Sequence, residues 1–319
     1  MLQFALATPH APVCFWGPKF WPELQKAQVG ELPQPPQAEQ EKSRFEEYER
    51  RIRNAFTTIR KKVSEYSPDA MVMIGDDQGE VFGKFFLPSL AIYTGQIVSG
   101  SRNTDLLKLS PKDNRVTLKV HQELANYLYQ GLIGMNFDLA KIEELLPPRP
   151  DEEPLRWMGL SHAFTRPSVE IMPSLNLPVI PIFVNCYFPP MPSSGRCYLL
   201  GQALRKLLDN RKEKVCLYAS GGLSHDVLGP RAGWVDEPLD RWCLEKLENG
   251  EGDALKNVFA FDSASLRAGT GELRNWIVIA GAIGSSRARI IDYIPHYHGA
   301  TGLGFAFWEP DEVLAQSSR

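Results

Sequence analysis

Polar residues that could carry out chemistry stand directly after short apolar runs at several places in the sequence. Where such runs form the strands of an open α/β sheet, ligands collect at the carboxyl ends of the strands. We therefore expect these polar segments to form one site. They are residues 8–12, 75–78, 220–226 and 269–272.

His10 and Glu272 are candidate metal ligands. His10 lies between two prolines, a rigid setting that could hold its imidazole in a fixed direction toward a metal ion. It could also be a loop histidine that binds a backbone carbonyl. Glu272 opens an apolar helix and could be a helix-capping residue, with Thr270 nearby as the cap. Together they supply two members of a two-histidine, one-carboxylate triad, which leaves open positions on iron.

His225 is the candidate general acid/base. It follows a glycine-rich turn, which would leave its imidazole at the sheet edge. It could also be a turn histidine, or the turn could bind phosphate. The phosphate-loop pattern G-x-x-x-x-G-K-[ST] and the serine-hydrolase pattern G-x-S-x-G are both absent around it, which lowers the weight of those two functions.

Two further pairs could take part in the site. Asp76 and Asp77 could be turn residues that bond their own backbone, or acceptors that orient a ligand. His296 and His298 alternate along a predicted extended stretch, a spacing that could chelate a metal ion. They could also be polar residues of the surface.

The elements that must position these residues follow from the hydrophobic pattern, in which short apolar runs alternate with segments of helical period. This pattern predicts an α/β fold in three layers, with a central, mostly parallel or mixed sheet flanked by helices. The predicted strands are residues 2–7, 70–74, 90–93, 179–184, 215–219, 289–293 and 302–307. The predicted helices are residues 40–66, 120–131, 199–208, 236–247 and 272–283. The pattern does not change across the proline-rich connection at 147–154, so we expect one domain over residues 1–319 with a C-terminal tail.

Composition excludes several classes of function. The net charge of -3 comes without a basic stripe, which argues against a nucleic-acid partner. No apolar run approaches the length of a membrane span. The 5 cysteines are scattered and form no C-x-x-C pair, so a disulfide framework or thiolate zinc site is not expected. The N-terminus lacks the pattern of a signal peptide, which predicts a cytoplasmic protein.

Taken together, these motifs resemble those of the class III extradiol ring-cleavage dioxygenases, the family of the catalytic β subunit of protocatechuate 4,5-dioxygenase and its gallate and methylgallate relatives. The resemblance rests on separated motifs in a fixed order along most of the chain. They are T-P-H-A-P at 8–12, Gly75-Asp76-Asp77 followed by Phe82, N-C-Y-F-P-P at 185–190, S-G-G-L-S-H at 220–225, G-W-V-D-E-P at 233–238, and Gly271-Glu272 before Trp276.

The resemblance implies a mononuclear Fe(II) centre that binds an aromatic diol and O2 and opens the ring next to the diol. By position, His10 and Glu272 match metal ligands, and His225 matches the acid/base histidine that deprotonates the diol. His121 lies near the region where relatives have another catalytic histidine. The resemblance also implies self-association, as a homo-oligomer.

Gln78 departs from the family pattern, because iron-dependent relatives have a histidine at this position. An amide oxygen is a harder and weaker donor than imidazole, which favours Mn(II) or another divalent metal over Fe(II). Three outcomes follow. Gln78 is a ligand of a weaker site, or another histidine (His162, His296 or His298) replaces it, or no metal binds and His10 and His225 act alone.

Other functions are compatible with the same residues. A hydrolase or C–C lyase could use His225 as a base without oxygen chemistry, and Gln78 motivates this alternative. A noncatalytic partner subunit is a third possibility, although a scaffold has no need of His10, His225 and Glu272. Arg166 or Arg196 could bind a ring carboxylate, or either could form a surface salt bridge.

Overall fold

The computed structural model describes residues 4–83, 86–102, 110, 114–145, 159–227 and 229–309. An 8-stranded mixed sheet crosses it, in the order β6-β3-β7-β2-β8-β1-β10-β9, and β4 pairs with β5 separately. The strands are β1 (Phe4–Thr8), β2 (Ala70–Gly75), β3 (Leu90–Tyr93), β4 (Ile97–Ser101), β5 (Arg115–Lys119), β6 (Ala140–Ile142), β7 (Val179–Val184), β8 (Val215–Ser220), β9 (Arg289–His296) and β10 (Thr301–Trp308).

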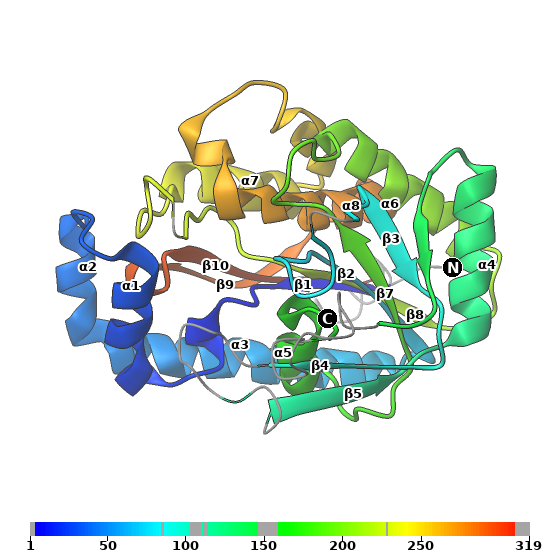
Figure 1. Cartoon of the computed structure of the whole chain (residues 1–319), viewed down its shortest axis with the longest axis horizontal. Coiled ribbons are helices and arrows are strands. Elements are labelled where there is room, and N and C mark those ends of the chain that lie inside the picture. The colour runs from blue at the N-terminus through cyan, green and yellow to red at the C-terminus, as the bar shows by residue number, and fades with distance from the viewer. Residues whose placement is uncertain are drawn as a thin grey trace, which may run out of the picture.

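Helices cover both faces of the large sheet, which confirms the predicted layered α/β architecture. They are α1 (Trp21–Val29), α2 (Pro36–Glu41), α3 (Phe45–Tyr66), α4 (Gln122–Gly134), α5 (His162–Ile171), α6 (Ser194–Leu208), α7 (Glu237–Glu248) and α8 (Leu273–Ile283). Helices α6, α7 and α8 lie on one side of the sheet, and α3 and α5 lie on the other (Figure 1). None of these described helices is long and apolar enough to span a membrane.

The centre of the sheet is parallel and fully buried. Strands β7, β2, β8 and β1 run side by side in the same direction. Every residue of these strands is buried, because helices cover both faces, and this explains why they read as continuous apolar runs in the sequence. Helix α8 is buried on all sides between the sheet and α6, which explains its uniformly apolar sequence.

The structure corrects some boundaries and adds elements. The helix expected over residues 40–66 is broken: α2 ends at Glu41, a 3-10 turn follows, and α3 begins at Phe45. Helices α1 and α5 and strands β4 to β6 were not predicted from the sequence. Helix α5 has only 10 residues, carries Pro167 inside it and begins with a buried histidine, so proline and polar residues hide it in the sequence. The connection at 147–154 and the tail after 309 lie outside the described residues.

His296 and His298 belong to a buried cluster away from the polar site. Both imidazoles face one carboxylate, that of Glu41: the Nδ1–carboxylate distances are 3.1 Å for His296 and 2.5 Å for His298. All three side chains are buried. This cluster joins α2 to the turn between β9 and β10, so the two histidines are structural and are not surface residues.

We expect Glu41 to make the fold sensitive to acid. Burial alone would raise the pKa of Glu41, but His296 and the hydrogen bonds from His298 lower it to about 2. A carboxylate with a lowered pKa stabilises the fold above its unfolded pKa, and this contribution is lost as pH falls toward the folded value. The melting temperature of the wild type should therefore fall more steeply between about pH 5 and pH 3 than that of Glu41→Gln.

Thermal unfolding followed by circular dichroism across this pH range measures the effect. Glu46→Gln is the matched control, because Glu46 is an exposed residue of the adjacent α3. The control should follow the wild type at every pH. Parallel curves for wild type and Glu41→Gln would contradict the expectation.

Candidate functional site

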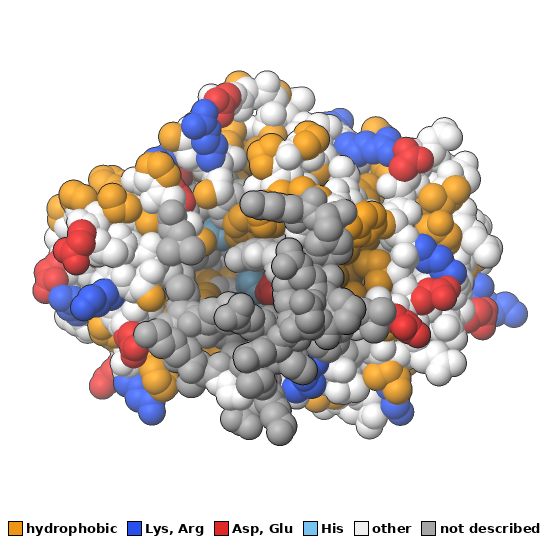
Figure 2. Space-filling view, viewed as in Figure 1, with side chains coloured by type: hydrophobic (Ala, Val, Ile, Leu, Met, Phe, Trp, Pro, Cys, Tyr) orange, Lys and Arg blue, Asp and Glu red, His pale blue; other side chains and the backbone are white. Residues whose placement is uncertain are grey.

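The predicted polar segments meet at one edge of the sheet, as expected for the carboxyl ends of parallel strands. Thr8 at the end of β1 pairs with Ser220 at the end of β8, and Gly75 ends the neighbouring β2. The loops that leave these strands carry His10, the Asp76 segment and the His225 turn. Figure 2 shows histidine and acidic side chains recessed near the centre of the face it presents.

His10, Asp76 and Glu272 converge on one buried point. The Nε2 atom of His10 lies 3.2 Å from Glu272 Oε1 and 4.0 Å from Asp76 Oδ1. One donor atom from each residue lies within 4.8 Å of the other two, a spacing that could hold a metal ion. Glu272 reaches this point from the 3-10 helix η8 (Ala268–Glu272), and its Oε2 accepts the Gly222 N–H at 2.7 Å.

The hydrogen bonds of His10 fix which nitrogen carries its proton. Ser220 Oγ lies 3.0 Å from His10 Nδ1 and donates its own hydrogen to the Ala163 carbonyl at 2.5 Å. The serine oxygen must therefore accept from His10 Nδ1–H. Nε2 is then the nitrogen that faces the carboxylates, the orientation that metal-bound histidines have in proteins.

His225 is held in a similar way. Its Nδ1 lies 3.0 Å from the Leu223 carbonyl, which can only accept, so Nδ1 carries the proton. Its Nε2 then faces the cluster, 3.3 Å from the Tyr187 hydroxyl and 3.3 Å from Glu272 Oε1. A Cβ at Gly269 would lie 1.9 Å from the His225 ring, so only glycine allows this packing.

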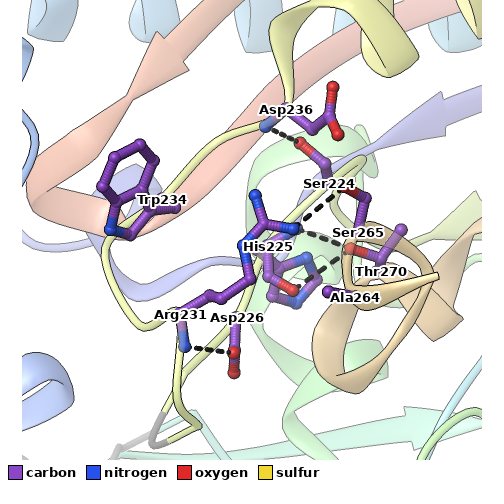
Figure 3. Close-up of a pocket in the computed structure, with 9 residues that line it drawn as sticks. All are labelled: Ser224, His225, Asp226, Arg231, Trp234, Asp236, Ala264, Ser265 and Thr270. Carbon is purple, nitrogen blue, oxygen red and sulfur yellow. Dashed lines mark hydrogen bonds between the residues drawn. The ribbon is translucent and has the colours of Figure 1, made fainter.

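A small pocket lies beside His225, and hydrogen bonds among the residues around it fix the turn that carries His225 (Figure 3). The Thr270 hydroxyl accepts the His225 backbone N–H at 3.0 Å. Ser224 Oγ accepts the backbone N–H of Asp236 at 2.7 Å and donates to Asp240 at 2.9 Å. These bonds tie the turn to η8 and to the start of α7, so the imidazole is held in one direction.

Gln78 reaches the site but presents its amide nitrogen. The Nε2 atom donates to the Tyr187 hydroxyl at 3.0 Å, to Glu272 Oε1 at 3.3 Å and to Asp76 Oδ2 at 3.4 Å. An amide N–H group is a donor and has no lone pair for a metal ion. The structure therefore brings Gln78 to the cluster, with its hydrogen-bond donors directed at the acidic groups.

The electrostatics of the cluster reflect two carboxylates and two imidazoles in one buried space. Burial and the Glu272 carboxylate raise the pKa of Asp76 to about 7. Burial alone would raise the pKa of Glu272, but His10 and His225 hold it well below its ordinary value. Burial alone would lower the pKa of each histidine, and Glu272 outweighs this effect and raises both. The two carboxylates and two imidazoles therefore share protons that a bound metal ion would displace.

His162 lies beside the cluster, and His121 does not. His162 packs edge-on against His10 with ring centroids 4.9 Å apart, and its Nδ1 is hydrogen bonded to Glu80. Burial and then Arg166 lower the pKa of His162 to about 4, so it is neutral. His121 instead caps α4 and donates its backbone N–H to Val179 at the start of β7, the opposite edge of the sheet. The structure does not bring His121 to the cluster.

Arg166 and Arg196, the two arginines considered for binding a substrate carboxylate, both donate to backbone carbonyls. Arg166 donates to the backbone carbonyls of His10 and Arg102, and it fixes the loop that carries His10. Arg196 donates to the Asn136 carbonyl.

Tyr187 is a residue of the site that the sequence did not single out, although its motif was noted. Its hydroxyl donates to Glu272 Oε1 at 2.5 Å.

Comparison with sequence families gives a match that covers most of the chain. Residues 29–308 match the family described as the catalytic LigB subunit of aromatic ring-opening dioxygenase. The matched range includes Asp76, Gln78, His225 and Glu272, and His10 lies before it.

Curated relatives match part of the chain at modest identity. A gallate dioxygenase of Pseudomonas putida is 28% identical over 191 residues, which are 57% of this chain and 52% of the relative. A 2,3-dihydroxyphenylpropionate/2,3-dihydroxicinnamic acid 1,2-dioxygenase of Photorhabdus laumondii is 27% identical over 198 residues, which are 61% of this chain and 55% of the relative. The chain thus spans about half the length of the curated relatives it matches.

Among solved structures, the crystal structure of an uncharacterized protein from Escherichia coli K12 has a similar fold. The TM-score is 0.51 at 14% sequence identity, and the match covers 96% of this chain and 99% of that chain. At this identity, the similarity supports the fold and carries no argument about activity.

Proposed function

Because this chain belongs to the family of the catalytic LigB subunit of aromatic ring-opening dioxygenases, we propose that it cleaves the ring of a catechol-type substrate with O2. In this reaction the carbon–carbon bond next to the diol breaks and both atoms of O2 enter the product. The diol is oxidised by O2 itself, so no other reductant is needed. The printed activities of the relatives suggest gallate and 2,3-dihydroxyphenylpropionate as the first substrates to test.

The observation that carries the proposal is the meeting of His10, Glu272 and His225 at one buried point. The donor set fits a divalent metal ion, since His10 Nε2 faces Glu272 Oε1 across 3.2 Å. Within the described residues, the ion pairs of Glu272 involve only histidines, so no Lys or Arg side chain fills the place. We propose that His10 and Glu272 hold Fe(II), with Mn(II) or another divalent ion as the alternative because of Gln78.

A non-heme metal ion in this place supplies the Lewis acidity and the electron transfer to O2 that ring opening requires. The side chains around it handle protons. His225 Nε2 faces the cluster, where its unprotonated form is placed to accept a proton from a diol hydroxyl. The Tyr187 hydroxyl lies 3.3 Å from this nitrogen, where it can bind the same oxygen. His162, neutral and packed on His10, adds no charge to the site.

The test is oxygen uptake by protein loaded anaerobically with Fe(II) or with Mn(II). The proposal predicts that equal amounts of O2 and diol are consumed and that a coloured ring-opened product forms. Metal-loaded protein that consumes no O2 with any of gallate, 2,3-dihydroxyphenylpropionate or catechol would contradict it. Turnover of a diol under argon would instead support the hydrolase or lyase with His225 as base. The proposal also includes a cytoplasmic location. It further includes self-association, which sedimentation of the purified protein tests.

A further inference from the structure

The two adjacent aspartates after β2 have very different environments. Asp77 accepts three backbone N–H groups, from Gly79 at 3.0 Å, Val81 at 2.9 Å and Phe82 at 3.1 Å. These bonds satisfy its carboxylate and fix the loop, so Asp77 is structural. Asp76 is fully buried but accepts no backbone N–H within the described residues.

The hydrogen bonds of Asp76 are few and long. Its Oδ1 accepts from Asn275 Nδ2 at 3.4 Å, and its Oδ2 accepts from Gln78 Nε2 at 3.4 Å. Both distances exceed the usual range for N–H···O bonds. A buried carboxylate with such weak partners costs free energy unless a cation is also present. Its only ion-pair partner among the described residues is His10, whose Nε2 lies 4.0 Å from Asp76 Oδ1.

The three groups nearest this point are all groups that can bind a metal ion. His10 Nε2, Glu272 Oε1 and Asp76 Oδ1 come from three separate segments, lie within 4.8 Å of one another, and belong to buried residues. A metal ion bound among them would take the place of the protons that these groups otherwise share. Gln78 does not supply the missing ligand, because its N–H donors point at Glu272 and Asp76.

We propose that Asp76, rather than Gln78, is the third protein ligand of the metal centre. Gln78 is then a positioning residue: its amide donates to Asp76 and Glu272 and keeps their oxygens apart. This inference rests on the proposed function only for the presence of a metal ion. It changes the donor set to one imidazole and two carboxylates, which is harder and more negative than two imidazoles and one carboxylate. Such a set is better suited to Mn(II) than the two-histidine set.

The experiment measures Mn(II) binding by the purified full chain, with no substrate. Free Mn(II) has a strong electron paramagnetic resonance signal that is lost on binding, so a titration gives the affinity directly. Residues that only orient a metal ligand are worth about 10- to 100-fold in affinity, so loss of a ligand should cost at least about 100-fold. We therefore expect Asp76→Asn to weaken Mn(II) binding by at least about 100-fold, and Gln78→Ala by about tenfold.

Two further variants make the result unambiguous. Asp138→Asn is the matched control, because Asp138 is exposed and lies outside the cluster, and it should bind like the wild type. The double variant Asp76→Asn with Gln78→His should recover most of the affinity, because it provides an imidazole beside the lost carboxylate. Recovery also shows that the Asp76 substitution leaves the fold intact.

Either of two results would overturn the inference. One is Mn(II) binding by Asp76→Asn equal to that of the wild type, or stronger than that of Gln78→Ala. The other is the absence of Mn(II) binding by the wild type. The proposed function fails separately, if protein that binds Mn(II) or Fe(II) consumes no O2 with any diol.

Discussion

Replacing His225 by glutamine should lower kcat for diol cleavage by about 10²- to 10⁴-fold, the usual contribution of general acid/base catalysis. Its Nδ1–H is committed to the Leu223 carbonyl, so Nε2 is the nitrogen that exchanges a proton with the site, 3.3 Å from Tyr187 and Glu272. Glutamine keeps a polar group of similar reach and removes the basic nitrogen. The affinity for the metal ion should change little, because His225 is not part of the proposed ligand set.

Oxygen uptake under saturating diol measures kcat, and Mn(II) titration measures the metal affinity of the same preparation. His121→Gln is the matched control, since it is the same substitution at the opposite edge of the sheet. It should retain the wild-type rate. If both variants lose activity equally, or if His225→Gln keeps full activity, the role assigned to His225 is wrong.

Replacing Glu272 by glutamine should abolish both metal binding and turnover. Glu272 Oε1 lies within 3.3 Å of His10 Nε2, His225 Nε2 and the Gln78 amide, and within 2.5 Å of the Tyr187 hydroxyl. Every neighbour of this oxygen therefore depends on its negative charge. A neutral amide here leaves too few anionic donors, so Mn(II) affinity should fall by at least about 100-fold, more than the loss of an orienting group costs.

The same Mn(II) titration and oxygen-uptake assay apply to this variant. Glu31→Gln, an exposed site in the loop after α1, is the control and should behave like the wild type. Circular dichroism of both variants checks that the fold is kept. Retained metal affinity in folded Glu272→Gln would show that the cation, if any, binds elsewhere.

Much of the fold could be predicted, because strands that are buried on both faces consist of apolar residues. The central strands are covered on both faces, and their unbroken apolar runs located them closely: the run at 179–184 is β7 and the run at 70–74 is β2 without its last residue. Helix α5 was missed because it is short and its buried residues include His162, Arg166 and Pro167, so its burial is not matched by an apolar composition. His162 and Arg166 contact His10, and this explains why polar residues are buried there.

For the site, the sequence predicted which loops converge, since the ends of parallel strands share an edge. It could not predict which of Asp76 and Asp77 faces the cluster, because that depends on which carboxylate the loop backbone binds. It could not predict which end of the Gln78 amide faces inward, since the neighbouring Glu272 lies far away in the chain. His162 was considered only as a substitute ligand, and its contact with His10 depends on where α5 packs.

The most direct measurement is anomalous X-ray diffraction from crystals of this protein grown or soaked with Mn(II). The account predicts a single strong peak between His10 Nε2, Asp76 Oδ1 and Glu272 Oε1, at bonding distance from all three. A peak beside the Gln78 oxygen with Asp76 turned away would contradict the proposed ligand set. A peak only at His296 and His298, or no peak at all, would contradict the metal centre itself.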